Sequence, residues 1–263
     1  MPTILDKIVA VKVKEIANAK ANIPLSVLKE KIKSTPDPID FRNALLSNPF
    51  SIIAEIKKSS PSKGLLAPNF DPVEQGLIYA NHGASAISIL TDTHFDGTMG
   101  HLIDVKRATV KKNIPILRKD FLIDPYQIYE SKIIQADAVL LIVAILGALR
   151  LEEMLLIAKS LNLQCLVEVH SQSELDIALN TEADIIGINN RNLHTFEINL
   201  DVTEKLAPMV GLQRIIVSES GIKSRADILR LQKAGAKAAL IGETLMTANN
   251  PKSTIAELLG YQE

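Results

Sequence analysis

Eight short apolar runs recur along the chain, and segments with helical patterning separate them. The runs cover residues 51–56, 86–90, 114–117, 138–145, 164–169, 185–188, 214–217 and 238–241. Most of them are almost continuously hydrophobic, which is typical of parallel strands that helices cover on both faces. This alternation predicts an α/β fold in which each helix returns the chain to the next strand of a parallel sheet.

Helix start signals in the intervening segments support this pattern. Asp71 and Asp124 each precede a proline, so each offers an N-cap residue followed by proline at the first helical position. Ser224 precedes Asp227 by three residues, as in a capping box. The predicted helices span residues 72–82, 125–135 and 224–234.

Eight strands joined by single helical crossovers indicate a (β/α)8 TIM barrel. An open doubly wound sheet is the alternative, but no G-x-G-x-x-G motif follows the first strand. The chain has 263 residues, 47% of them hydrophobic, which is enough for one barrel domain. We expect residues 1–263 to form a single domain in which residues 1–49, with apolar positions at helical spacing, are an N-terminal helical extension.

Charge and cysteine content exclude several classes of partner. Lys plus Arg number 29 against 30 Asp plus Glu, so no overall basic field attracts nucleic acid or an anionic membrane. Charged residues interrupt the first 30 positions, which argues against a signal peptide or a membrane span there. Cys165 is the only cysteine and lies in an apolar run. We therefore expect a cytoplasmic protein without a nucleic-acid or membrane partner.

Polar residues follow the predicted strands where a (β/α)8 barrel carries its active site, at the C-terminal strand ends. They are Glu55 and Lys57; Arg118, Lys119 and Asp120; Glu168 and His170; Asn189, Asn190 and Arg191; Ser218, Glu219, Ser220 and Gly221; and Gly242 and Glu243. One Lys–Glu pair at a strand end is usually an ordinary surface pair. The convergence of so many polar groups on one face instead predicts an active site.

Two features of this face bear on its ligands. Gly221 and Gly242 follow the last two strands, where barrels bind phosphate through backbone N–H groups, so we expect a phosphorylated small molecule. Asp92, His94 and Asp96 resemble metal ligands, but no H-E-x-x-H or paired-cysteine motif accompanies them. We interpret them as a polar loop and expect no metal. We assign His170 to the next helix start or to a supporting role behind the reacting groups.

Several stretches resemble the indole-3-glycerol phosphate synthase family of tryptophan biosynthesis. They are "IIAEIKKSSPSKG", "SILTD", "PILRKDFLIDPYQIYES", "LVEVHSQSEL", "IIGINNRNLHTFEINL", "VSESGI" and "LIGETLM", in the family's order between positions 52 and 246. The resemblance implies a lyase that closes the ring of 1-(2-carboxyphenylamino)-1-deoxyribulose 5-phosphate, then removes carbon dioxide and water. It also implies a helical extension before the barrel and a reaction without cofactor or metal.

The resemblance also implies roles for individual residues. Lys119 matches the acid that stands beside the ketone oxygen during ring closure, where negative charge develops. Glu168 matches the catalytic glutamate, and Lys57 a second lysine that Glu55 would hold charged. The other matching positions are Asn189 and Glu219, which would position the substrate and the catalytic groups; Ser60, Arg191, Ser220, Gly221 and Gly242, which would bind its anionic ends or shape the mouth; Glu243, through its backbone; and Phe121 and Leu193, near the anthranilate ring. Which lysine acts in which step stays open.

Two competing interpretations remain at this point. Phosphoribosylanthranilate isomerase shares the phosphate-binding face but would use a Cys and Asp pair, whereas Cys165 lies within a predicted strand. A barrel that only binds a phosphorylated ligand is the other alternative, and the presence of Lys57, Lys119 and Glu168 argues against it. The loop from Ser59 to Gly64 is expected to close over the substrate. We expect a monomer.

Overall fold

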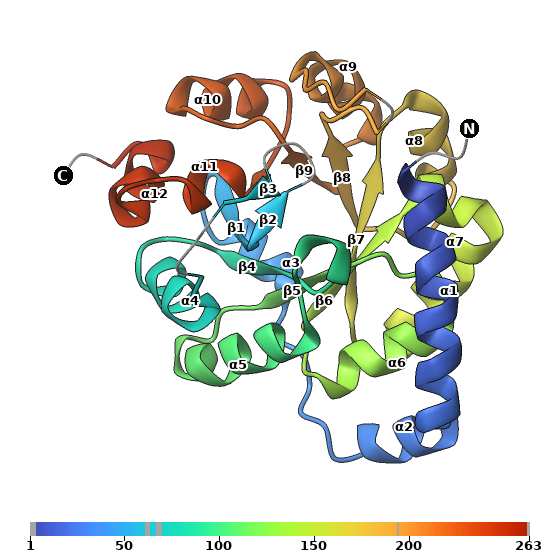
Figure 1. The fold of residues 1–263 in the computed structure, drawn as a ribbon. Coiled ribbons are helices and arrows are strands. Elements are labelled where there is room, and N and C mark those ends of the chain that lie inside the picture. The colour runs from blue at the N-terminus through green and yellow to red at the C-terminus, as the bar shows by residue number, and fades with distance from the viewer. Residues whose placement is uncertain (1–3, 61–63, 67–69, 194, 262–263) are drawn as a thin grey trace.

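A computed structural model describes residues 4–60, 64–66, 70–193 and 195–261, except for the side chains of Ile4 and Ser60 (Figure 1). Eight parallel strands form a closed barrel: β1(Ser51–Ile56), β4(Ala86–Leu90), β5(Ile116–Lys119), β6(Ala138–Ile142), β7(Gln164–Val169), β8(Ile185–Asn189), β9(Ile215–Glu219) and β10(Ala238–Ile241). Strand β1 pairs with both β4 and β10, which closes the ring. The predicted (β/α)8 barrel is confirmed.

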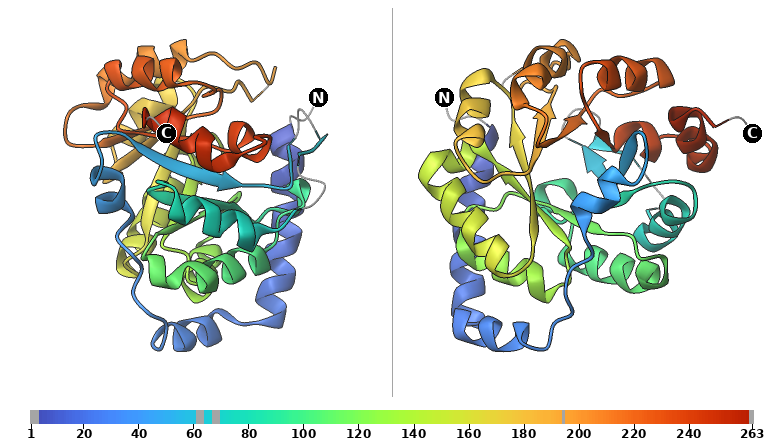
Figure 2. Two further views of the ribbon diagram at one scale, coloured as in Figure 1. Left: turned by 90° about the vertical axis from the view of Figure 1, so that its left-hand side faces the viewer. Right: turned by 180° about the vertical axis from the view of Figure 1, so that it is seen from behind.

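Helices surround this ring on the outside, as the two further views show (Figure 2). They are α4(Pro72–Asn81), α5(Met99–Thr109), α6(Pro125–Ile133), α7(Val143–Ser160), α8(Gln172–Leu179), α9(Asp201–Val210), α10(Arg225–Lys233), α11(Glu243–Met246) and α12(Pro251–Leu259), with 3-10 turns η1(Thr93–Phe95) and η2(Val110–Lys112). Among the described residues, no helix combines the length and apolarity that a membrane crossing requires.

The predicted helix starts are confirmed by their caps. The Asp71 side chain accepts hydrogen bonds from the backbone N–H groups of Val73 and Glu74 at the start of α4. Asp124 caps α6 and Ser224 caps α10, each within a complete capping box. The three helices end one or two residues before the predicted positions, within the usual uncertainty of a helix end.

Three local predictions were wrong. The run 138–145 is not one strand, because β6 ends at Ile142 and α7 begins at Val143; apolar content alone does not separate a buried strand from a buried helix start. The third strand begins at Ile116, directly after Pro115, which has no N–H for the ladder. A short antiparallel hairpin, β2(Ser59–Ser60) with β3(Gly64–Leu65), follows β1 where only a loop was expected.

The N-terminal segment forms three helices that contact the barrel at different places. They are α1(Ile4–Asn22), α2(Leu25–Ile32) and α3(Phe41–Leu46). Helix α1 lies along the outside of the barrel beside α6 (Figure 1). Phe41 and Leu45 of α3 are fully buried and pack with the residues inside the barrel, so this helix covers the N-terminal end of the ring.

Side-chain parity within the strands places the site. Ile53, Leu117, Leu166 and Val217 belong to the cluster inside the ring, and their neighbours along each strand belong to the layer between strands and helices. Strand side chains alternate between the two faces. The residue two positions after each of these four therefore points into the barrel at its C-terminal end: Glu55, Lys119, Glu168 and Glu219.

Candidate active site

A cavity of about 460 Å³ opens at the C-terminal ends of the strands. All of the predicted site residues except Ser60 line it: Glu55, Lys57, Lys119, Phe121, Glu168, Asn189, Arg191, Leu193, Glu219, Ser220, Gly221, Gly242 and Glu243. Ser60 pairs through its backbone with Gly64 in the hairpin, while its side chain lies outside the described part of the structure. Sequence patterning thus located the mouth of the cavity at the ends of β1, β5, β7, β8, β9 and β10.

Lys119 lies at the centre of the charged groups in this cavity. Its Nζ donates to Oε2 of Glu168 at 3.0 Å and lies 3.5 Å from Oε2 of Glu219. Burial by itself would lower the pKa of the ammonium, but the charges of Glu168, Glu219 and Glu55 outweigh burial and raise that pKa. Lys119 is therefore a fixed cation at neutral pH.

The two carboxylates beside Lys119 differ in protonation. Burial raises the pKa of Glu168, but Lys119 and His170 outweigh burial and hold the pKa below its usual range. Burial and the charge of Glu168 raise the pKa of Glu219, so its neutral form is favoured. Two titratable groups with opposite shifts in one cavity are typical of acid–base chemistry.

Glu219 is also packed against a glycine. Its Oε1 is buried without a hydrogen-bond partner among the described residues. A Cβ atom at position 187 would clash with this oxygen, so Gly187 on β8 leaves the room that the carboxyl group needs. The sequence offered no sign of this, because nothing in the chain marks a strand glycine as facing a carboxylate.

Lys57 and Glu55 form a second pair across the cavity. Lys57 Nζ lies 2.7 Å from Oε1 of Glu55. Burial raises the pKa of Glu55, while the charges of Lys57 and Lys119 outweigh burial and lower it, so the carboxylate is ionised. A Cβ atom at Gly242 would clash with Glu55 and approach Lys57 Nζ. Gly242 therefore also makes room for this ion pair, beyond the phosphate contact predicted from the sequence.

The β9 end shows backbone strain at the predicted phosphate position. Ser220 has φ +66°, a left-handed conformation that is uncommon for a non-glycine residue, and Gly221 follows with φ +87°. Such conformations are costly and gather at functional sites, where surrounding contacts hold them. On the neighbouring strand, Oδ1 of Asn189 accepts a hydrogen bond from the backbone N–H of Arg191, which fixes the amide at the cavity wall.

Apolar side chains form the other wall of the cavity. The rings of Phe95 and Phe121 stack with their centroids 6.1 Å apart. Leu193 lies in the same wall, and Leu5 and Ile8 of α1 complete it. Sequence analysis missed Leu5 and Ile8, because nothing in an amphipathic helix at the chain start tells which of its residues reach a distant strand end.

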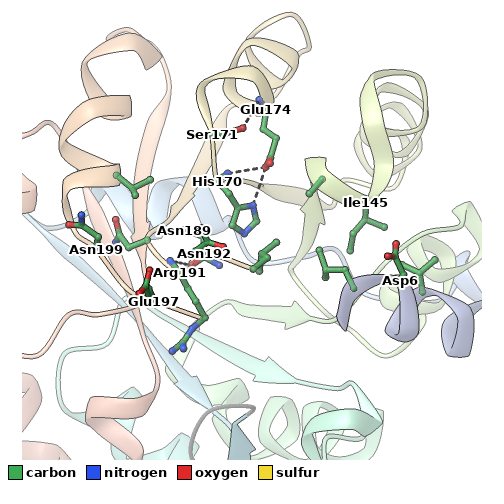
Figure 3. A pocket seen from close by; sticks show the side chains of 16 residues that line it. Asp6, Ile145, His170, Ser171, Glu174, Asn189, Arg191, Asn192, Glu197 and Asn199 are labelled. Carbon is green, nitrogen blue, oxygen red and sulfur yellow. Dashed lines mark hydrogen bonds and ion pairs between the residues drawn. The ribbon is translucent and has the colours of Figure 1, made fainter. Parts of the chain in front are cut away.

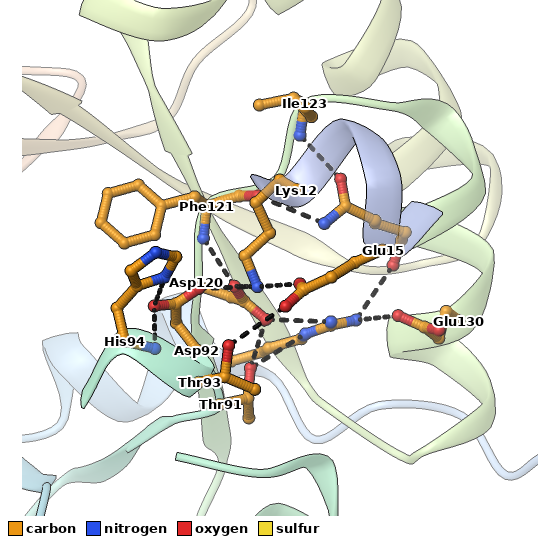
Figure 4. A network of polar contacts seen from close by, with 12 residues as sticks. Lys12, Glu15, Thr91, Asp92, Thr93, His94, Asp120, Phe121, Ile123 and Glu130 are labelled. Atoms are coloured by element: carbon orange, nitrogen blue, oxygen red, sulfur yellow. Dashed lines mark hydrogen bonds and ion pairs between the residues drawn. The ribbon is translucent and has the colours of Figure 1, made fainter. Parts of the chain in front are cut away.

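Arg118, Asp120 and Asn190, predicted at the mouth, have polar partners behind the strand ends, as does Ser218; Asp120 nevertheless also lines the cavity. Arg118 and Asp120 flank Lys119 with the opposite parity, and they join a buried network with Lys12 of α1 (Figure 4). Asn190 hydrogen-bonds to Ser218 and to backbone oxygens of the β9 end. Alternation of side chains along a strand accounts for Arg118, Asn190 and Ser218.

The loop after β4 contains an ion pair where a metal site was considered. Lys12 Nζ lies 2.7 Å from Oδ2 of Asp92, so an ammonium group neutralises this carboxylate. Asp92 also accepts a hydrogen bond from the backbone N–H of His94. Asp96 ends the η1 turn in a left-handed conformation. The described residues contain no group of three or more His, Cys, Asp or Glu that could hold a metal.

A second cavity of about 620 Å³ adjoins the first and shares Leu5, Asn189, Arg191 and Leu193 with it. His170 points into this space and contacts Glu174 (Figure 3). His170 lines only this second cavity, and its Nε2 lies 3.1 Å from Glu168 of the first.

Comparisons with known proteins give consistent matches over almost the whole chain. Residues 5–258 match the family model described as indole-3-glycerol phosphate synthase. A protein of that name from Dehalococcoides mccartyi is 48% identical over 97% of this chain and 100% of its own length. Another, from Albidiferax ferrireducens, is 46% identical over 98% of each chain. A thiamine phosphate pyrophosphorylase from Pyrococcus furiosus matches in structure with a TM-score of 0.60 at 17% identity, covering 81% of this chain and 95% of that one; this likeness concerns the fold alone.

Proposed function

The chain belongs to the indole-3-glycerol phosphate synthase family, and on that premise we propose how its own residues perform the reaction. The enzyme is a carboxy-lyase of tryptophan biosynthesis that acts on a small phosphorylated substrate. The reaction closes a ring, releases carbon dioxide and then eliminates water. The observation that carries our assignment is the position of Lys119 between Glu168 and Glu219, with Lys57 and Glu55 in the same cavity.

We assign ring closure to Lys119. As the carboxyl-bearing aromatic carbon attacks the ketone carbon, the C=O electron pair moves onto oxygen and needs a proton or a cation beside it. The ammonium of Lys119 is only partly exposed to the cavity and is held charged by its carboxylate neighbours, so it supplies both. Loss of carbon dioxide then restores the aromatic ring without a further catalytic group.

We assign the elimination of water to Lys57 and Glu168. The hydroxyl group formed from the ketone oxygen leaves with a proton from Lys57, while Glu168 takes the proton from the neighbouring carbon and the new double bond forms. Glu55 holds the ammonium group of Lys57 in place through a contact of 2.7 Å. An acid and a base on different strands allow the two protons to move at different places.

The ends of the substrate have matching surroundings in the cavity. We place the phosphate at Ser220, Gly221, Gly242 and the backbone of Glu243, because barrels bind phosphate after their last two strands. We place the carboxylate near Arg191. The anthranilate ring would then lie against the apolar wall that includes Phe121 and Leu193. Asn189 and Glu219 would hold the sugar hydroxyls, and Ser60 would contact the substrate from the hairpin.

Paired lysine variants test this assignment. Lys119→Met removes the acid of the first step, so carbon dioxide release and indole fluorescence should both fall by about 10²–10³-fold. Lys57→Met should release carbon dioxide in a single turnover while indole fluorescence lags, because only the last step is blocked. Release and fluorescence that fall together in Lys57→Met would contradict the division of roles. Turnover of Lys119→Met within a few-fold of the parent would contradict the acid assignment.

We also propose that the chain acts as a monomer in the cytoplasm. Cys165 is buried and unpaired, and burial raises the pKa of its thiol to about 12, so it stays an inert thiol in a reducing compartment. Light scattering during gel filtration tests this proposal, and a mass twice that of the chain would overturn it.

A further inference from the structure

We propose that His170 is a positioning residue for the reaction, a buried cation that holds the Glu168 carboxylate in its ionised, substrate-facing state. The proposal rests on the role of Glu168 assigned above. In this proposal His170 acts on the reaction only through Glu168, and Glu174 supports His170 from behind. Glu174, His170, Glu168 and Lys119 then form a row of alternating charges from α8 to β5.

The geometry places the imidazole between two carboxylates. Its Nε2 lies 3.1 Å from Oε1 of Glu168, a charge contact without hydrogen-bond alignment, and its Nδ1 hydrogen-bonds to Oε2 of Glu174 at 3.0 Å. The backbone N–H of His170 donates to the same Glu174 oxygen at 2.9 Å. Figure 3 shows this arrangement of His170 and Glu174 at the start of α8. The side chain of His170 is only 10% exposed, so solvent does not replace either contact.

The number of ring protons decides the charge of this group. A neutral imidazole has one N–H and one bare nitrogen, so it offers a proton to only one of two facing carboxylates. The imidazolium has two N–H groups and suits both. Burial would lower the pKa of His170, but the nearby carboxylates of Glu168 and Glu174 outweigh burial and raise the pKa to about 10. The residue is therefore a cation throughout the neutral range.

This cation completes the surroundings of Glu168. Oε2 of Glu168 faces Lys119 and Oε1 faces His170, so each carboxylate oxygen has its own cationic partner. Two fixed partners leave the carboxylate one orientation. Lys119 and His170 also lower the pKa of Glu168, so the proton of the Glu168–Glu219 pair is favoured on Glu219 and Glu168 stays ionised.

Charged groups face the imidazole from several elements. Glu168 on β7 and Glu174 on α8 contact the imidazole directly, Lys119 on β5 contacts Glu168, and Glu219 on β9 contacts Lys119. Asp6, Glu197 and Arg191 line the adjoining cavity. Acidic groups thus outnumber basic ones on this side of the site. Loss of the cation at position 170 should therefore raise the pKa of Glu168.

The pH profile of the variant His170→Asn tests the proposal. Asparagine keeps a polar side chain but carries no charge, so the acidic limb of kcat/KM, set by Glu168, should move up by about 1–3 pH units. Glu174→Gln leaves the imidazole in place and weakens its hold on the proton, so the variant should lose activity at a lower alkaline pH than the parent. His82→Asn, the same change at the opposite end of the barrel, is the matched control and should leave the profile unchanged.

The outcomes separate this proposal from the role of Glu168 itself. An acidic limb of His170→Asn at the parent position overturns the proposal, even where kcat falls, because a merely structural histidine would lower kcat without moving the limb. Should His170→Asn not fold, an unchanged alkaline limb in Glu174→Gln overturns it. Activity retained in Glu168→Gln would instead overturn the function assigned to Glu168. Circular dichroism and thermal melting establish that each variant is folded.

Discussion

Glu168 and Glu219 show how surroundings give one residue type two states. Both carboxyl groups lie within 3.5 Å of Lys119 Nζ. Glu168 has His170 as a second cationic partner, whereas Glu219 has an unpartnered buried oxygen. The pair titrates jointly, and the proton belongs on Glu219. A cavity with one ionised and one neutral carboxyl group can both accept and donate protons.

The variant Glu219→Gln tests whether Glu219 is neutral in the folded protein, through the pH dependence of the free energy of unfolding. Burial and Glu168 raise the pKa of Glu219 from 4.5 to about 8 in the folded state. Between these values the folded protein binds more protons than the unfolded chain, so this group makes stability fall as pH rises from about 4.5 to about 8. Glutamine resembles the neutral acid and has no such dependence. The free energy of unfolding of the variant should therefore exceed that of the parent increasingly up to about pH 8.

Urea unfolding at several pH values measures this difference, and groups common to both proteins cancel at matched pH. A difference that is constant from about pH 5 to about pH 8 would show that Glu219 is ionised throughout. Such a gain in stability would accompany a loss of activity, because Glu219 lines the cavity beside Lys119 and its costly burial serves the site.

For individual residues, the sequence predicted which strand ends contribute to the cavity but not the direction of every side chain. Glu55, Lys119 and Glu168 were placed in the cavity by the strand ends alone. Arg118 was counted with them, although its parity turns it outward, and Asp120 lines the cavity while its carboxylate pairs with Arg118 and Lys12. The charge states were beyond prediction, since the pKa of Glu219 depends on its distance from Glu168 across two strands.

Among the helices, α1 is tied to the barrel by a buried charge network. Lys12 Nζ lies 2.7 Å from Asp92, 2.9 Å from Asp120 and 3.0 Å from Glu15 (Figure 4). Asp120 also accepts a hydrogen bond from Thr91 and pairs with the guanidinium of Arg118 on β5. Asp120 directly follows Lys119. The extension therefore holds the strand end that carries the proposed acid.

The variant Lys12→Met should lower stability strongly. It keeps the apolar stem but leaves Asp92 and Asp120 buried without their cation, and breaking a buried charge pair costs about 3–5 kcal/mol. Lys7→Met makes the same change at an exposed position of the same helix and should stay within about 0.5 kcal/mol of the parent. Urea unfolding at neutral pH compares the two variants. Equal effects of both would mean that the network is as weak as a surface ion pair.

Elements with local signals were predicted well, and elements fixed by tertiary contacts were not. The caps Asp71, Asp124 and Ser224 are short-range features, so the sequence located the starts of α4, α6 and α10. The boundary between β6 and α7 has no cap side chain, since Ile142 occupies the N-cap. Tertiary contacts of the barrel fix the change from strand to helix at this boundary, and no local sequence pattern marks it.

For the whole molecule, the N-terminal helices join opposite ends of the barrel. At the N-terminal end, Asp137 accepts hydrogen bonds from the backbone N–H groups of Ile39 and Ile116, each at 2.7 Å, and pairs with Lys106. At the other end, Leu5 and Ile8 of α1 line the active cavity. We therefore propose that residues 1–49 form one domain with the barrel, and a truncated form tests this proposal.

Removal of residues 1–22 is the corresponding prediction. The truncated chain retains α2 and α3, so the N-terminal end of the barrel stays covered, but it loses Lys12 and the buried side chains of Ile8 and Ile16. Two such side chains and one buried charge partner together represent several kcal/mol of stability. The barrel should therefore melt at a lower temperature. It should also bind substrate more weakly, because part of the apolar wall is missing.

Steady-state kinetics and calorimetry below the new melting temperature distinguish these two effects. If KM increases in the truncated enzyme but not in Lys12→Met, the loss of binding belongs to the wall residues and not to the charge network. A truncated enzyme with parental KM and kcat and a parental melting temperature would contradict the single-domain interpretation. In that case α1 would be a separable attachment, and the ion pairs of Lys12 would be features of a surface that the barrel does not need.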